Sequence, residues 1–147
     1  MSSLPSASIQ LSASAEDSAF AAMMAELIRA NLSDHPHKLH DFRAMHGRVA
    51  LVAEDAEQTI TLHFCGGKLR VHQGLFGIPD LVIRGSSESL IDLSRLPPDP
   101  RFKFLPDVRS EVARTLLRAL LQRKLRIGGL RSHLLLAHRL SNVMSIH

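Results

Sequence analysis

Hydrophobic and polar residues alternate most regularly in the middle of the chain, on both sides of the pair Gly66-Gly67. The apolar members of this alternation are Ile60, Leu62, Phe64, Leu69 and Val71. A period of two is typical of a half-buried strand, and two glycines between such runs favour a tight turn. If Cys65 pairs with Lys68, all these apolar side chains share one face. We therefore predict a β-hairpin with one buried face and one polar face in contact with water.

Apolar residues recur at helical spacing near both ends of the chain. The first such stretch covers residues 15–32 and follows Ser14, a residue type that often caps helix N-termini. Two more cover residues 110–122 and 131–146. Each stretch has an apolar stripe along one side, so we predict three amphipathic helices.

The remaining predicted elements are short and are separated by loops with Pro, Gly or polar residues. They are strands over 48–54, 80–84 and 123–127, a helix that begins at Ser86 or Ser87, and a loop over 33–47. Strands and helices without regular β-α-β alternation favour an α+β fold over a doubly wound one. For 147 residues we expect one domain, over residues 15–147, after a flexible tail over residues 1–14.

The overall composition is that of a globular protein, with 45% hydrophobic and 22% charged residues. No apolar run is long enough to span a bilayer. The N-terminal residues lack the basic start and apolar stretch of a signal peptide. The single cysteine, Cys65, cannot form an internal disulfide bond. These features predict a cytoplasmic protein.

Positive charge is concentrated in the last third of the chain. Residues 101–147 hold ten Lys or Arg and two Asp or Glu, whereas residues 1–100 hold eight and twelve. Such a surface could contact an anionic membrane or a protein partner, or could simply be solvated. Nucleic acid is disfavoured because Trp and Tyr are absent and no nucleic-acid-binding motif is present. The candidate docking residues are Arg114, Arg118, Arg123, Lys124 and Arg126.

Residues suited to metal binding or catalysis do not form a convincing set. A histidine cluster lies in a Pro-containing polar segment that we interpret as a loop: His35, His37 and His40. In the predicted hairpin, His63 and His72 lie on the polar face, with Arg70 opposite His63. We interpret Cys65 as a strand end, because no nucleophile motif surrounds it. The sequence therefore predicts no enzyme, no metal site and no cofactor.

Four segments, in order over residues 46–146, resemble the sterol carrier protein type 2 domain family. They are the glycine turn with Lys68-Leu69-Arg70-Val71, the strand 80–83 with the helix 89–96, the run 120–129 and the C-terminal amphipathic helix. The run 120–129 is similar to the family pattern G-K-L-x-I followed by glycine. Arg123 stands where the family usually has glycine, and the segment before Leu120 is longer than in the family.

The resemblance implies a curved, mostly antiparallel sheet covered by helices, here with an extra N-terminal helix. It also implies an apolar tunnel for a lipid or sterol chain. Family members act as lipid carriers, as lipid-binding modules or as non-enzymatic helpers in bacterial isoprenoid-quinone synthesis. The candidate lining residues are Phe104, Leu116, Leu117, Leu120, Leu121, Leu134, Leu135, Leu140, Val143 and Met144. The same leucines could instead form an ordinary core. The chain would then be a protein-interaction module with a filled or vestigial pocket, docking through its basic face.

Overall fold

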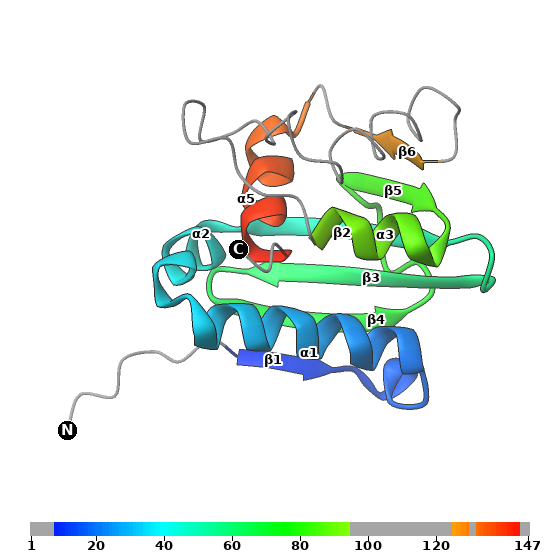
Figure 1. Cartoon of the computed structure of the whole chain (residues 1–147), viewed down its shortest axis with the longest axis horizontal. Coiled ribbons are helices and arrows are strands. Elements are labelled where there is room, and N and C mark those ends of the chain that lie inside the picture. Colours follow the sequence, from blue (N-terminus) through cyan, green and yellow to red (C-terminus); the bar gives the residue numbers. More distant parts are fainter. Residues whose placement is uncertain (1–7, 95–124, 130–131, 145–147) are drawn as a thin grey trace.

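The computed structural model describes residues 8–94, 125–129 and 132–144. In this part of the chain, six strands form one open sheet in the order β1-β4-β3-β2-β5-β6, and the helices lie on one of its faces (Figure 1). Three strand pairs are antiparallel, whereas β1-β4 and β2-β5 are parallel. The α+β class with a mostly antiparallel sheet is therefore confirmed.

The elements follow one another along the chain with short connections. The strands are β1 (Ser8–Leu11), β2 (His46–Ala53), β3 (Gln58–Cys65), β4 (Lys68–Gln73), β5 (Leu81–Gly85) and β6 (Leu125–Gly128). The α-helices are α1 (Ala19–Asp34), α2 (Leu39–Ala44), α3 (Ser87–Ser94) and α5 (Leu134–Met144), and single 3-10 turns cover Ala13–Ala15 and Pro36–Lys38. The predicted helix over 110–122 lies outside the described residues.

The predicted hairpin is confirmed in position and register. Phe64 pairs with Leu69 and His63 with Arg70. Both glycines of the turn have positive φ, at 55° for Gly66 and 96° for Gly67, which matches the twist of a two-residue hairpin. All five predicted inward side chains are at most 1% exposed. The alternation of apolar and polar residues was therefore sufficient to predict this part of the sheet.

The N-terminal segment differs from its prediction. Residues 8–11, assigned above to a flexible tail, form β1, which pairs in parallel with β4 at the edge of the sheet. Ile9 and Leu11 pack against the core, and Arg29 of α1 donates a hydrogen bond to the carbonyl of Ile9 (3.1 Å). Four residues are too short for a clear periodic pattern, so only the neighbouring strand makes this segment a strand.

The first helix begins later than predicted, and the predicted loop that follows contains a helix. Ser18, rather than Ser14, caps α1 by accepting a hydrogen bond from the amide of Ala21 (3.1 Å). The Ser14 hydroxyl accepts from the amide of Gln73 at the end of β4 (3.2 Å). In the predicted loop, α2 buries Phe42, which packs edge to face on Phe64 with ring centroids 6.1 Å apart.

The face of the sheet opposite the helices is crossed by a segment that the sequence did not reveal. Because β4 and β5 run in the same direction with β3 and β2 between them, residues 74–80 must pass over this outer face. Three strand spacings amount to about 14 Å, and the seven connecting residues can reach about 23–25 Å. The connection is therefore long enough to cross all three spacings. We call Gly74–Pro79 the strap.

The strap covers part of the face that we predicted to be wet. The hydroxyl of Thr61 donates a hydrogen bond to the carbonyl of Gly74 (2.7 Å) and accepts one from the amide of Phe76 (3.0 Å). Thr61 is fully buried, and His72 is 7% exposed beneath the ring of Phe76. The prediction of an entirely solvent-facing polar face was wrong for these residues, because alternation within a strand cannot reveal what a distant loop covers.

Asp80, directly after the strap, lies at a tight junction of three segments. Its amide donates to the carbonyl of Arg48 (2.8 Å), and its carboxylate accepts from the amide of Arg48 (2.9 Å). Gly129, after β6, has φ of 85°, and a Cβ atom there would lie 2.2 Å from the carbonyl oxygen of Asp80. Glycine is therefore required at this point for both its conformation and its size.

We expect Gly129→Ala to destabilise the protein by about 3 kcal/mol or more, because it adds a backbone clash to left-handed strain. Gly74→Ala is the matched control. Gly74 has a similar φ of 77°, but a Cβ atom there would meet no neighbouring atom within 4 Å. This control should cost only the strain, about 1–2 kcal/mol. Urea denaturation of both variants measures the difference, and equal losses would contradict the role of the junction.

Candidate functional site

An apolar layer between the sheet and the helices is the main candidate site. We call it the inner layer. It consists of the side chains of every second strand residue and of those on one side of the helices. The buried residues that form it are at most 9% exposed. Its sheet side includes Val49, Leu51, Ile60, Leu62, Phe64, Leu69, Val71, Leu81 and Ile83, and its helix side includes Met24, Ile28, Leu32, Leu90, Leu136, Leu140, Val143 and Met144.

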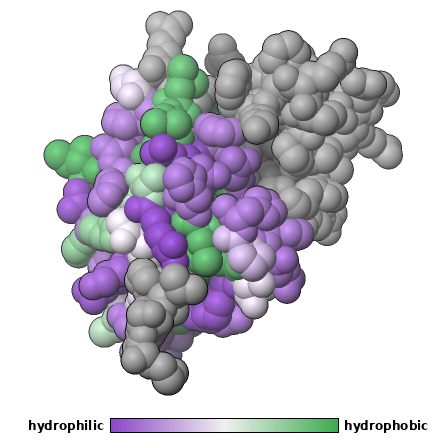
Figure 2. All heavy atoms as spheres, turned by 90° about the vertical axis from the view of Figure 1, so that its left-hand side faces the viewer, coloured by the Kyte–Doolittle hydropathy of each residue, from purple (hydrophilic) through white to green (hydrophobic). Residues whose placement is uncertain are grey.

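The predicted lipid-lining residues of helix α5 fall into two groups. Leu140, Val143 and Met144 are at most 3% exposed and belong to the inner layer. Leu134 and Leu135, in the first turn, are 63% and 59% exposed. Seen from the left of Figure 1, hydrophobic side chains reach the surface in separate spots among hydrophilic ones (Figure 2). The other predicted lining residues lie outside the described residues: Phe104, Leu116, Leu117, Leu120 and Leu121.

The end of α5 is held by a buried side chain from α1. Asn31 is 4% exposed, and its amide donates to the carbonyls of Val143 (3.1 Å) and Met144 (2.8 Å). These carbonyls belong to the last turn of the helix, which has no intrahelical partners for them. An unpaired buried carbonyl costs about 1–3 kcal/mol, so Asn31 fixes where α5 ends on the inner layer. Sequence periodicity gave no sign of this contact.

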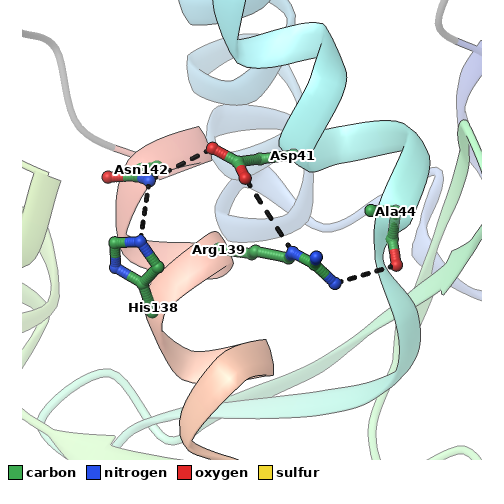
Figure 3. Close-up of polar contacts among 5 residues, drawn as sticks. All are labelled: Asp41, Ala44, His138, Arg139 and Asn142. Atoms are coloured by element: carbon green, nitrogen blue, oxygen red, sulfur yellow. Dashed lines mark hydrogen bonds and ion pairs between the residues drawn. The ribbon is translucent and has the colours of Figure 1, made fainter. Parts of the chain in front are cut away.

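A polar network joins α5 to α2 on the same side of the sheet (Figure 3). Asp41 accepts a hydrogen bond from Asn142 (3.1 Å) and lies 3.8 Å from the guanidinium of Arg139. Arg139 also donates to the carbonyl of Ala44 (3.4 Å), and Asn142 lies 3.4 Å from His138. These side chains are partly buried, so the network fixes the orientation of α5 against α2.

The start of α5 is next to the junction at Asp80. The Nε2 atom of His133 lies 3.5 Å from the carboxylate of Asp80. Leu134 follows His133 directly, so the exposed leucines of α5 are close to the end of the strap. Helix α5 thus begins with an exposed apolar turn beside Asp80, and its last turn is hydrogen-bonded to Asn31.

Of the predicted docking residues, only Arg126 is described. Its guanidinium forms an ion pair with Glu54 at 2.6 Å, and both side chains are about half exposed. The other four lie outside the described residues: Arg114, Arg118, Arg123 and Lys124. An exposed ion pair contributes little to stability, so Arg126 can exchange this partner for another anion at small cost.

The candidate metal and nucleophile residues are arranged as follows. The rings of His35 and His37 meet edge to face, with centroids 5.8 Å apart. Among the described residues, no three His, Cys, Asp or Glu side chains gather as a metal site would require. Cys65 is exposed, with its sulfur 3.5 Å from Nε2 of His63. None of the described helices is long and apolar enough to cross a membrane.

A second cluster lies on the outer face, beneath the strap. Phe76 stacks on His72 with centroids 3.8 Å apart, and the rings of His63 and His72 are 6.5 Å apart. Burial lowers the pKa of His63, and the charges of Arg48 and Arg70 lower it further. Burial also lowers the pKa of His72, with further contributions from His63, Arg70 and Arg48. Sequence analysis placed these histidines on one face but did not identify Phe76.

The lowered pKa values of His63 and His72 predict a loss of stability in acid. The unfolded chain binds protons on these residues more readily than the folded chain, so stability falls as pH drops below about 6.5. In the double variant His63→Gln and His72→Gln, stability should fall less between about pH 7.5 and 5 than in the wild type. Urea midpoints across this range measure both, and an unchanged pH dependence would contradict the prediction.

Sequence comparison identifies no relative: no protein-family model matches the chain, and no curated protein matches it. Structural comparison does find similar folds. A ubiquinone synthesis protein, UbiJ-SCP2, has a TM-score of 0.59 and 13% identity over 85% of this chain and 92% of its own.

Two further structures are sterol carrier proteins. The sterol carrier protein domain 2 of Helicoverpa armigera has a TM-score of 0.51 and 21% identity over 84% of this chain and 83% of its own. A crystal structure of sterol carrier protein 2 has the same TM-score and 15% identity over 84% of this chain and 92% of its own. At these identities the likeness concerns architecture. The chain has the fold of the sterol carrier protein 2 domains.

Proposed function

We propose that the protein binds and carries a hydrophobic lipid without catalysing a reaction, and that the lipid is of isoprenoid or quinone type. The fold supports this proposal, because the similar structures include sterol carrier proteins. The ligand class draws support from the similar structure described as a ubiquinone synthesis protein. The lipid chain would lie between the helices and the sheet, beside the inner layer.

The observation that carries the proposal is the exposure of Leu134 and Leu135. The side of α5 that faces the inner layer is buried, with Leu136 9% and Leu140 3% exposed. At about 100° per residue, Leu134 and Leu135 lie on the side of α5 that is turned away from this buried stripe. They offer apolar contact to a chain that approaches at this end of the helix. Each CH₂ group buried there contributes about 0.8 kcal/mol, so a lipid tail needs no polar motif to bind. This accounts for a binding site that leaves no polar signature in the sequence.

The test begins with native mass spectrometry of protein purified without detergent. We expect an adduct of lipid mass, and solvent extraction should release an isoprenoid or quinone-type molecule. A protein emptied during purification should take up added isoprenoid alcohol. A mass without adduct, together with no uptake of isoprenoid or fatty acid, would overturn the proposal and favour the interaction module with a filled pocket.

Leu134→Gln combined with Leu135→Gln should weaken uptake about tenfold or more, because the two leucines together lose apolar contact worth at least about 1.4 kcal/mol. Met23→Gln is the matched control. Met23 is also exposed, at 42%, but lies on α1. Uptake measured by fluorescence of a lipid probe compares the two. Equal weakening in both variants would contradict a site at the start of α5.

A further inference from the structure

The strap is the most exposed apolar segment among the described residues. Its sequence, Gly-Leu-Phe-Gly-Ile-Pro, has no charged side chain. Leu75 is 63%, Phe76 44% and Ile78 85% exposed. Single exposed apolar residues are ordinary in globular proteins, but three within four residues mark a contact surface. This segment lies on the face opposite the inner layer, so the proposed lipid site does not account for it.

The strap is fixed in place, with the ring of Phe76 against the sheet and Leu75 and Ile78 exposed. Thr61 binds it through the carbonyl of Gly74 and the amide of Phe76. The ring of Phe76 lies flat on His72, tilted by 6°. Asp80 fixes the far end to Arg48. Because the backbone is already ordered, a contact made by Leu75 and Ile78 loses little conformational entropy on binding.

The surroundings of the strap are positively charged. None of the described strands contains Asp or Glu. All Lys and Arg residues of these strands alternate with inward-facing residues and therefore lie on the outer face: Arg48, Lys68, Arg70, Arg84 and Arg126. Arg48, His63 and Arg70 stand opposite one another in one row across three strands. Glu54 pairs with Arg126, and Asp80 follows the strap, but the strand residues of this face carry only positive charge. An uncharged apolar strap thus crosses a predominantly cationic sheet face.

We propose that this face docks on an anionic lipid bilayer. Leu75 and Ile78 enter the boundary between headgroups and acyl chains, while Lys68, Arg70 and Arg84 contact lipid phosphates. Exposed apolar residues with cations around them match the two attractions that hold a peripheral protein on such a surface. Docking concerns the outer face and does not depend on whether the inner layer carries a lipid.

A second copy of the chain fits this face less well than a bilayer. Two copies meeting through the strap would bring like charges together, including Arg70 of each copy, and like charges repel across an interface. An acidic protein surface offers the opposite charge but no apolar depth for Ile78, which is 85% exposed. An anionic bilayer offers both negative charge and an apolar interior that Ile78 can enter, so we assign it as the partner of this face.

A tryptophan placed in the strap tests insertion directly, because the natural chain contains no Trp or Tyr. We expect the emission of Ile78→Trp to shift to shorter wavelength with vesicles of phosphatidylglycerol and phosphatidylcholine. Met23→Trp, on α1, should show no such shift. A shift at Met23 alone, or no shift at Ile78, would overturn the proposal.

Vesicle sedimentation measures the affinity. Leu75→Ser combined with Ile78→Ser should weaken binding about tenfold or more, because each side chain loses its insertion. Met23→Ser should bind like the wild type. Binding should also fall in Arg70→Gln, on pure phosphatidylcholine, and as salt rises from about 0.05 to 0.5 M, which shortens the range of charge attraction.

The remaining outcomes separate the possible occupants and the two proposals. Analytical ultracentrifugation that finds a dimer lost in the Leu75→Ser, Ile78→Ser variant, without vesicle binding, would replace the bilayer by a second copy. Binding to polyglutamate but not to vesicles would replace it by an acidic protein. The same variant should retain lipid in native mass spectrometry. Protein without lipid that still binds vesicles would leave docking standing and overturn only the carrier function.

Discussion

The parallel arrangement of β4 and β5 is the constraint on which the rest of the structure depends. Two strands that run in the same direction cannot be joined by a hairpin, and with two strands between them the chain must cross a face of the sheet. The helices occupy one face, so the strap takes the other (Figure 1). The strap then fixes Asp80, and Asp80 in turn sets where β5, β6 and the start of α5 meet.

Two kinds of anchor stabilise this crossing. Thr61, in the centre of the sheet, satisfies two backbone groups of the strap with one hydroxyl. At the far end, Asp80 and Arg48 exchange backbone and carboxylate hydrogen bonds. Gly77 favours glycine because its φ is 73°, and a Cβ atom there would also lie 2.9 Å from the guanidinium carbon of Arg48, whose side chain would have to move aside. Covering Arg48 in this way leaves its Nε atom buried without a partner among the described residues.

Sequence alone predicted the elements that local pattern controls and missed those that distant contacts control. The hairpin was predicted to the residue, because alternation and the turn glycines specify the same register. The short helix α3 begins as expected, with Ser86 accepting a hydrogen bond from the amide of Ser89 (3.1 Å). By contrast, β1 forms by pairing with the edge of β4, and α2 is stabilised by the packing of Phe42 on Phe64. Both contacts join residues that are far apart in the sequence.

The candidate site shows the same difference between local pattern and distant contacts. Periodicity identified Leu140, Val143 and Met144 as one side of α5, and these residues are buried. Leu134 lies six residues before Leu140, so the same 100° per residue places it on another side, where it is exposed. What periodicity could not predict is how α5 is fixed on the sheet, by Asn31 at one end and beside Asp80 at the other.

Because side chains alternate along β3 and β4, the same two strands supply residues to both faces of the sheet, and a change in their length affects both faces at once. Leu62 pairs with Val71 on the apolar face, and the next pair, His63 and Arg70, lies on the outer face. Adjacent residues therefore belong to opposite surfaces. Inserting or deleting a single residue within either strand would turn every following side chain to the opposite face. Point substitutions can modify one surface at a time, but changes in strand length can be tolerated only where β3 and β4 end.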